Sequence, residues 1–242
     1  MSDLLGLISI LLVSLAVIYI ALKNPEVSKI ILFALILRVL VILIGHYVAI
    51  LPDSTKDALG FEDLAWSYGK DGFLNALSKF PGMNSYFYSW GIGMLYSLFG
   101  RSILMAQSIS LLFGVGTVFL GWLLAKKIWG DLTANKVGWV LALFPSLVLY
   151  SALPLREVYS GFFLLVAFFG VFNWVSKGNY NSILLAMFGF IGATFFHGPL
   201  ILGCIIFLII VGITSLRKLL GNVIFLKLNF QAFLITILCL GV

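Results

Sequence analysis

Charged side chains are scarce in this sequence of 242 residues. Asp, Glu, Lys and Arg together make up 10% of it, whereas 62% of the residues are hydrophobic. A soluble domain of this size does not need so much apolar side chain, because about 45–50% is typical of globular domains. The composition therefore excludes an ordinary soluble protein and indicates an integral membrane protein.

Cysteines and clustered basic residues are scarce as well. The two cysteines, Cys204 and Cys239, both lie inside apolar runs, which is typical of small core residues rather than of a disulfide framework or a metal site. The formal net charge is +6, but the basic residues are scattered at the ends of apolar runs. We therefore expect no nucleic-acid partner and attribute the positive charge to membrane topology.

Apolar runs of the length of a membrane span recur along the chain, and a crossing helix needs about 20 such residues. They predict spans at 4–22, 29–51, 103–124, 136–150, 158–175, 182–196 and 200–215. The last run, 229–242, is short for a crossing, so we expect an incomplete helix or a truncated chain. The predicted fold is an all-α, polytopic transmembrane bundle of about 7–8 spans, forming a single module over residues 1–242.

The loop at about 52–102 is the largest, and the distribution of charge indicates that it is external. Basic residues favour cytoplasmic loops, and with this loop outside, alternation of the spans leaves only Glu26 and Asp131 as acids inside. The basic residues on the inside are then Lys23, Lys29, Lys126, Lys127, Lys136, Lys177, Arg217, Lys218 and Lys227. The assignment requires segment 86–99 to be a short interfacial helix, since it is too short to cross; if it crosses, every later loop inverts.

Acidic residues concentrate in one stretch of this loop, KDALGFEDLAW at 56–66. One interpretation is that Asp57 caps a helix and that Glu62 and Asp63 merely solvate its outer surface. The other is that Asp57 is a general base, which deprotonates an acceptor at the membrane surface beside a lipid-linked donor. The residues alone leave both interpretations open.

Several stretches in order resemble the N-terminal module of the GT-C-fold glycosyltransferases, such as protein mannosyltransferases and aminoarabinose transferases. They are RVLVILIGHYVAILPD (38–53), DALGFEDLAW (57–66), FPGMNSYFYSWGIGMLYSLFGRS (80–102), AQSISLLFGVGTVFLGWLLAKKIWG (106–130) and FPSLVLYSALPLREVYSGFF (144–163). The resemblance covers roughly residues 29–200 and lies in the order and topology of the segments.

The resemblance implies a set of site residues. It implies that Asp57 is the catalytic base, that Glu157 is a second functional acid with Arg156 beside it, and that Glu62 occupies a less constant position. His197, in FHGPL, stands where many members have an arginine, which puts phosphate binding there in doubt. Alternatively, Arg156 and Glu157 form a structural pair at the membrane interface, where a helix begins and its dipole favours Glu157.

Physical requirements suggest the remaining roles. A polyprenyl-phosphate donor needs a groove open to lipid and cations at the headgroup level, for which the candidates are Arg156, His197 and Lys56. Tyr86 or Trp90 could stack on the sugar. Asp53, Asp57 and Glu62 offer oxygen ligands for a divalent metal, but the sequence does not decide whether one binds.

The sequence thus predicts an enzyme that moves a sugar from a polyprenyl-phosphate donor to a glycan, lipid or protein acceptor. The expected location is a bacterial inner (plasma) membrane, with the active site extracytoplasmic. A lipid or polysaccharide transporter or flippase, or a non-catalytic membrane assembly subunit, is the alternative; coupled transport is disfavoured because the predicted span interiors contain no Asp or Glu.

Arg38 and His46 lie within or at the end of the second predicted span. Arg38 is about 14 Å from Lys29 along a helix, so we expect it to snorkel to the inner interface or to pack, rather than to contact the donor. We interpret His46 as an interfacial histidine with satisfied hydrogen bonds.

Overall fold

The structure is a computed structural model that describes the backbone of residues 2–224 and the side chains up to residue 217. The described residues form helices and no strand, which confirms the predicted all-α class. The chain divides into two compact units, Met1–Gly198 and Pro199–Val242. Helix α11 (Ile201–Ile224), preceded by the 3-10 turn Gly198–Leu200, lies in the second unit.

Five helical segments among the described residues are long and apolar enough to cross a membrane, as expected of a membrane protein. They are α1 (Ser2–Lys23), α2 (Ser28–Tyr47), α6 (Ile103–Trp129), α9 (Glu157–Lys177) and the segment Gly198–Arg217. The predicted span 136–150 is instead divided between α7 (Asp131–Leu143) and α8 (Pro145–Tyr150), and α10 (Tyr180–Phe196) has only 17 residues. The predicted run 229–242 lies outside the described residues.

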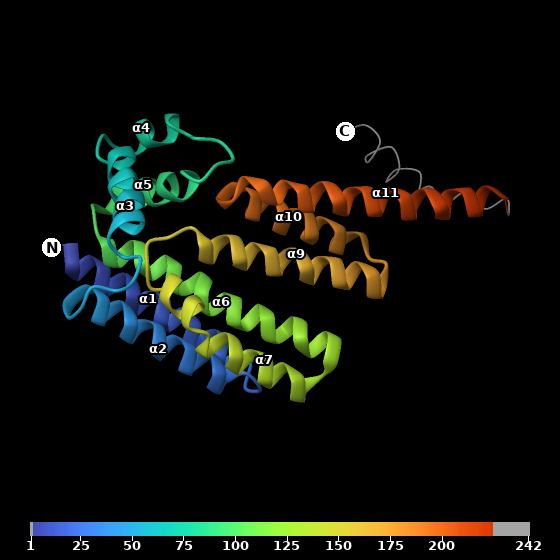
Figure 1. Ribbon diagram of the computed structural model, residues 1–242, viewed down its shortest axis with the longest axis horizontal. Coiled ribbons are helices and arrows are strands. Elements are labelled where there is room, and N and C mark those ends of the chain that lie inside the picture. The colour runs from blue at the N-terminus through green and yellow to red at the C-terminus, as the bar shows by residue number, and fades with distance from the viewer. Residues whose placement is uncertain (1, 225–242) are drawn as a thin grey trace. The chain divides into compact units, whose positions relative to one another are not determined.

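Helix α6 is the centre of the first unit and contacts α1, α2, α7 and α9 (Figure 1). Of its most apolar stretch 61% is buried, against 22% for α1, whose outer face exposes leucine and isoleucine side chains. Such a face is compatible with lipid rather than water, whereas α6 is the most buried of the five candidate spans.

Short helices fill the long loop between α2 and α6, as predicted. They are α3 (Lys56–Gly69), α4 (Phe73–Ser78) and α5 (Phe87–Phe99), which gather at one end of the unit (Figure 1). Helices α3 and α5 cross at two glycines: a Cβ on Gly93 would meet the Ala65 carbonyl oxygen at 2.6 Å, and one on Gly69 would overlap the Gly93 carbonyl. The backbones can approach this closely only because neither position has a side chain.

Arg38 packs inside the bundle, which is one of the two expected arrangements, and does not snorkel to the inner interface. The side chain is fully buried in the first unit. Its Nε donates to Ser151 Oγ at 2.9 Å, its Nη1 to the carbonyls of Ala34 and Ala142, and its Nη2 to the carbonyl of Leu141.

The partners of Arg38 explain why it stays inside. Pro145 has no N–H, so the carbonyl of Leu141, four residues earlier, loses the hydrogen bond that a continuous helix would give it. Phe144 is extended, as is usual before proline, and the helix breaks there. The guanidinium donates to Leu141 at 3.3 Å and to Ala142 at 3.2 Å, and so satisfies two carbonyls that the break exposes.

Replacing Arg38 by methionine should lower the free energy of unfolding by about 3 kcal/mol, because two buried carbonyls then lack donors. Chemical unfolding in detergent micelles measures the change. The matched control is Lys29→Met, on the exposed surface of the same helix, which should change stability by less than about 0.5 kcal/mol. Equal stability of the two variants would contradict the structural role of Arg38.

Gly93→Ala should destabilise the protein by about 1–3 kcal/mol, since its Cβ would press on the backbone of α3. Gly91→Ala, two residues earlier in α5, is the matched control, because nothing lies within 4 Å of a Cβ there. That change should stabilise by about 0.5–1 kcal/mol through helix propensity alone. Thermal unfolding midpoints of the two variants should therefore move in opposite directions.

Candidate functional site

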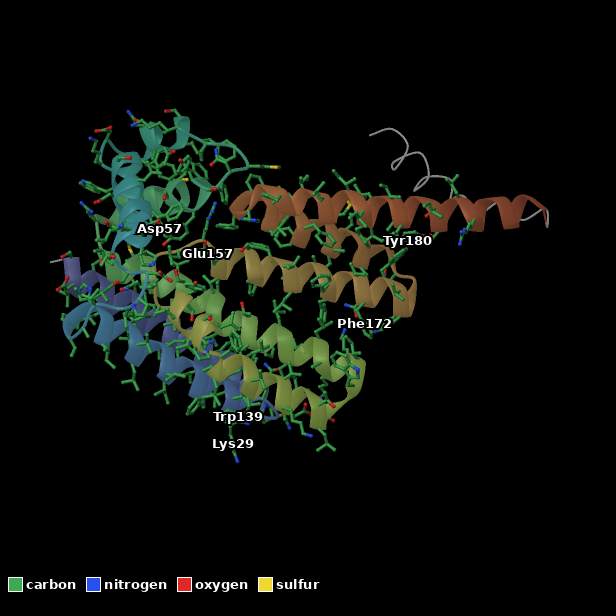
Figure 2. All side chains as sticks on the ribbon, viewed as in Figure 1. Lys29, Asp57, Trp139, Glu157, Phe172 and Tyr180 are labelled. Atoms are coloured by element: carbon green, nitrogen blue, oxygen red, sulfur yellow. The ribbon has the colours of Figure 1, made fainter. Side chains whose placement is uncertain are left out.

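The start of α3 lies against the turn that precedes α9. Ala58 is buried in a small apolar cluster with Leu153 and Leu155, and Figure 2 shows Asp57 and Glu157 at this place. The side chain of Asp57 is exposed, and within residues 2–217 it makes no hydrogen bond or ion pair. Lys56 is exposed beside it, also without such a partner there.

Arg156 and Glu157 form the other half of this arrangement. The guanidinium of Arg156 lies over the ring of Phe61 in α3, with Cζ 5.6 Å from the ring centroid. Its Nε is buried, has no hydrogen bond within the described part of the chain, and lies 3.5 Å from Glu157 Oε1. Glu157 stands in the first turn of α9, where the helix dipole favours a carboxylate. The structure thus pairs Arg156 with Glu157 against α3, the helix whose first turn contains Asp57, and leaves a cation able to bind an anion.

Two cavities flank the first turns of α9. The smaller, of about 110 Å³, is lined by Glu157, Val158 and Gly161 together with residues of α6 and α8. The larger, of about 370 Å³, is lined by Tyr159 and Phe163 together with apolar side chains of α5, α6 and α10. Asp57 lines neither cavity, so Glu157 is the predicted carboxylate that reaches enclosed space.

His197 and Tyr86 lie near the larger cavity rather than beside Asp57. His197 is exposed and follows Phe196, whose ring stacks on that of Tyr159 at 5.0 Å. Tyr86 is exposed and precedes Phe87, whose ring lies 5.2 Å from that of Phe196. The predicted site residues therefore form two groups. One is at the start of α3 and the first turn of α9, and the other consists of His197 and Tyr86. The aromatic side chains of the larger cavity lie between the two groups.

Two buried tyrosines, which the sequence reading missed, belong to the wall of the larger cavity. The hydroxyl of Tyr88 is buried and has no hydrogen-bond partner among the described residues, whereas Tyr159 shares a 3.1 Å hydrogen bond with Ser110. Burial raises the pKa of Tyr88 well above its ordinary value, with a smaller contribution from Tyr159, so its phenol stays neutral. Tyr88 was hidden in the aromatic stretch SYFYSW (85–90), which reads as part of an interfacial belt.

Glu62 is not a solvated surface acid, and that expectation is wrong. Its side chain is 1% exposed, accepts two hydrogen bonds from Arg101, at 3.0 and 2.5 Å, and a third from the Tyr96 hydroxyl at 2.9 Å. Burial and the neighbouring Glu62 carboxylate raise the pKa of Tyr96, which keeps it a donor. Glu62 therefore joins α3 to α5 and to the start of α6, and it lies on a different helix face from Asp57.

The described residues contain no assembled set of ligands for the predicted divalent metal. No group of three His, Cys, Asp or Glu side chains gathers within residues 2–217. The oxygens of Glu62 are already bonded to Arg101 and Tyr96, and Asp57 has no second carboxylate from α3 on its face. A divalent metal stays an untested prediction, for which Asp53 and Asp57 are the predicted ligands that make no hydrogen bond or ion pair within the described residues.

Comparison with protein-family models, with curated proteins and with solved structures found no match for this chain. The candidate site therefore rests on its own geometry.

Arg101→Met should lower the free energy of unfolding by about 3 kcal/mol, because it leaves the carboxylate of Glu62 buried without its cation. Asp63→Asn is the matched control: Asp63 accepts a hydrogen bond from the same guanidinium at 2.5 Å but is exposed, so its loss should cost less than about 1 kcal/mol. Chemical unfolding in micelles measures both free energies of unfolding. A similar decrease in the two variants would show that the burial of Glu62 does not account for the contribution of Arg101 to stability.

Proposed function

We propose that the protein is a membrane glycosyltransferase, which moves a sugar from a polyprenyl-phosphate donor to a glycan, lipid or protein acceptor on the extracytoplasmic side. The observation that carries the proposal is the group of Asp57, Arg156 and Glu157 at one end of the first unit. It combines two carboxylates with a guanidinium that makes no hydrogen bond within the described residues.

The chemistry of the group suits this transfer. A carboxylate takes the proton of the acceptor hydroxyl or amine while the acceptor atom bonds to the anomeric carbon. The bond between that carbon and the phosphate oxygen breaks, and the lipid phosphate leaves with its electron pair. Arg156 stabilises the leaving phosphate by charge-assisted hydrogen bonds, and His197 donates a hydrogen bond to it from the side of the larger cavity.

The two carboxylates are suited to different parts of this step. Asp57 is exposed and faces an acceptor that arrives from water, whereas Glu157 lines the cavity of about 110 Å³ and pairs loosely with Arg156. We assign Asp57 as the base and Glu157 as the group that orients Arg156 and the sugar. Lys56 supplies a second cation near the phosphate, and Tyr86 stacks on the sugar from the loop before α5.

The larger cavity suits the isoprenoid tail of the donor. It has about 370 Å³, its lining is almost entirely apolar, and it includes Tyr159 in the first turns of α9, the helix that begins at Glu157. A tail bound there keeps the phosphate at the first turn of α9. If the divided segment α7–α8 and helix α10 also cross, the five candidates become seven, which supports the proposed bundle of 7–8 spans; we propose a bacterial inner membrane as its location.

Asp57→Asn and Glu157→Gln should each reduce transfer by about 100-fold or more, since general-base catalysis and anion orientation both contribute on that scale. The assay supplies membranes containing the full chain with a radiolabelled polyprenyl-phosphate sugar and measures label that leaves the lipid. Asp71→Asn is the matched control, an exposed acid of the same loop that pairs with Lys79.

Transfer by Asp57→Asn at the rate of the unchanged protein would remove Asp57 as the base. Label that crosses the membrane while still attached to its lipid would instead identify a transporter. Folding of each variant is checked by its elution as a single species in detergent.

A further inference from the structure

A cavity of about 490 Å³ lies at the end of the first unit opposite to Asp57 and Glu157. It is formed where the turn between α1 and α2 meets the last turns of α6, and its polar lining residues are Lys23, Asn24, Glu26, Lys126 and Lys127. Helix α6 has 27 residues, so this cavity and the start of α6 are about 40 Å apart. The cavity has no part in the proposed transfer.

The three lysines differ in their partners. Lys126 forms ion pairs with Glu26 and, at 3.0 Å, with Asp131, so its charge is compensated. Lys23 and Lys127 have no carboxylate partner within the described residues. Lys23 lies over the Tyr19 ring, and Lys127 donates to Asn173 at 2.7 Å and lies over the Phe169 ring. The cavity is therefore lined by two lysines that form no ion pair with a carboxylate of the described residues.

The surroundings of the cavity show what kind of anion can reach it. The outer face of α1 is apolar up to its last turn, where Leu22 is 75% exposed and Lys23 follows. This change from apolar to charged side chains marks the level at which hydrocarbon gives way to headgroups. Lys127 lies at the corresponding level of α6, beside the exposed Ile128 and Trp129. An anion held here is thus at the height of lipid phosphates.

We propose that this cavity binds the phosphate headgroup of an anionic phospholipid, held between Lys23 and Lys127. The positive-inside rule assigns this end to the cytoplasmic leaflet, which is rich in anionic lipids, and basic pockets between spanning helices suit such headgroups. The phosphate compensates the two ammonium groups that no carboxylate of the described residues reaches. The acyl chains lie along the exposed apolar face of α1.

The test measures binding of short-chain phosphatidylglycerol to the full purified chain in detergent, by native mass spectrometry. Lys23→Gln and Lys127→Gln should each raise Kd about fivefold, and the double variant about 25-fold, from roughly one charge interaction per lysine. Lys29→Gln is the matched control: it removes the same charge from the same end but does not line the cavity, and Figure 2 shows Lys29 pointing away from the bundle. Its Kd should stay within about twofold of the unchanged protein.

Phosphatidylcholine and inorganic phosphate complete the design. Equal binding of phosphatidylcholine would overturn the proposal, as would a loss in Lys29→Gln equal to that in Lys23→Gln. Inorganic phosphate that displaces phosphatidylglycerol at equal concentration would show a site for a soluble anion and would also overturn it. Lys23 is exposed and contacts only the Tyr19 ring, so Lys23→Gln should fold normally. Its Kd for phosphatidylglycerol therefore tests the proposal even if the double variant does not fold.

Discussion

The buried guanidinium of Arg38 is the constraint on which the rest of the first unit depends. It donates to Leu141 and Ala142, whose carbonyls the break before Pro145 exposes, and to Ser151 at the end of α8. A charge inside an apolar bundle is costly unless its donors are used, and here four hydrogen bonds use them. The broken helix and the buried cation therefore stabilise each other, and neither is tolerable alone.

The position of the candidate site depends on the contact between Arg38 and Ser151. Ser151 is held by Arg38, and the next carbonyl, that of Ala152, accepts a hydrogen bond from Gln107 at 2.8 Å. The chain then runs through the turn that packs on Ala58 and reaches Arg156, over the ring of Phe61. A series of contacts therefore connects Arg38, in the middle of α2, to Arg156, whose guanidinium makes no hydrogen bond within the described residues and can bind an anion. Rigid support of this kind keeps a functional side chain in place without using its own hydrogen bonds.

The sequence was sufficient for features that depend on local pattern. Apolar runs predicted the spanning helices, and the loop before Ile103 contains short helices as expected. It failed where a contact joins distant residues: nothing near Arg38 reveals carbonyls more than 100 positions away, and nothing near Glu62 points to Arg101, 39 residues later. The sequence therefore left open whether Arg38 snorkels or packs and allowed Glu62 to be a solvated surface acid, although each has its partners inside the fold. The resemblance to a transferase family stays a prediction, because no comparison bears on it.

What separates a structural charge from a candidate functional one here is whether the fold already supplies its partners. Arg38 and Glu62 are saturated by hydrogen bonds, and Lys126 by two carboxylates. At one end of α6, Arg156 makes no hydrogen bond within the described residues and pairs only with Glu157, at 3.5 Å. At the other end, Lys23 and Lys127 have no carboxylate partner among the described residues. A protein with so few charges gains little from leaving cations uncompensated at a lipid boundary unless an anion joins them there. We therefore propose phosphate as the anion at both ends of the bundle. The end with Arg156 also has Asp57, which makes no ion pair within the described residues, so the proposed chemistry is assigned to that end.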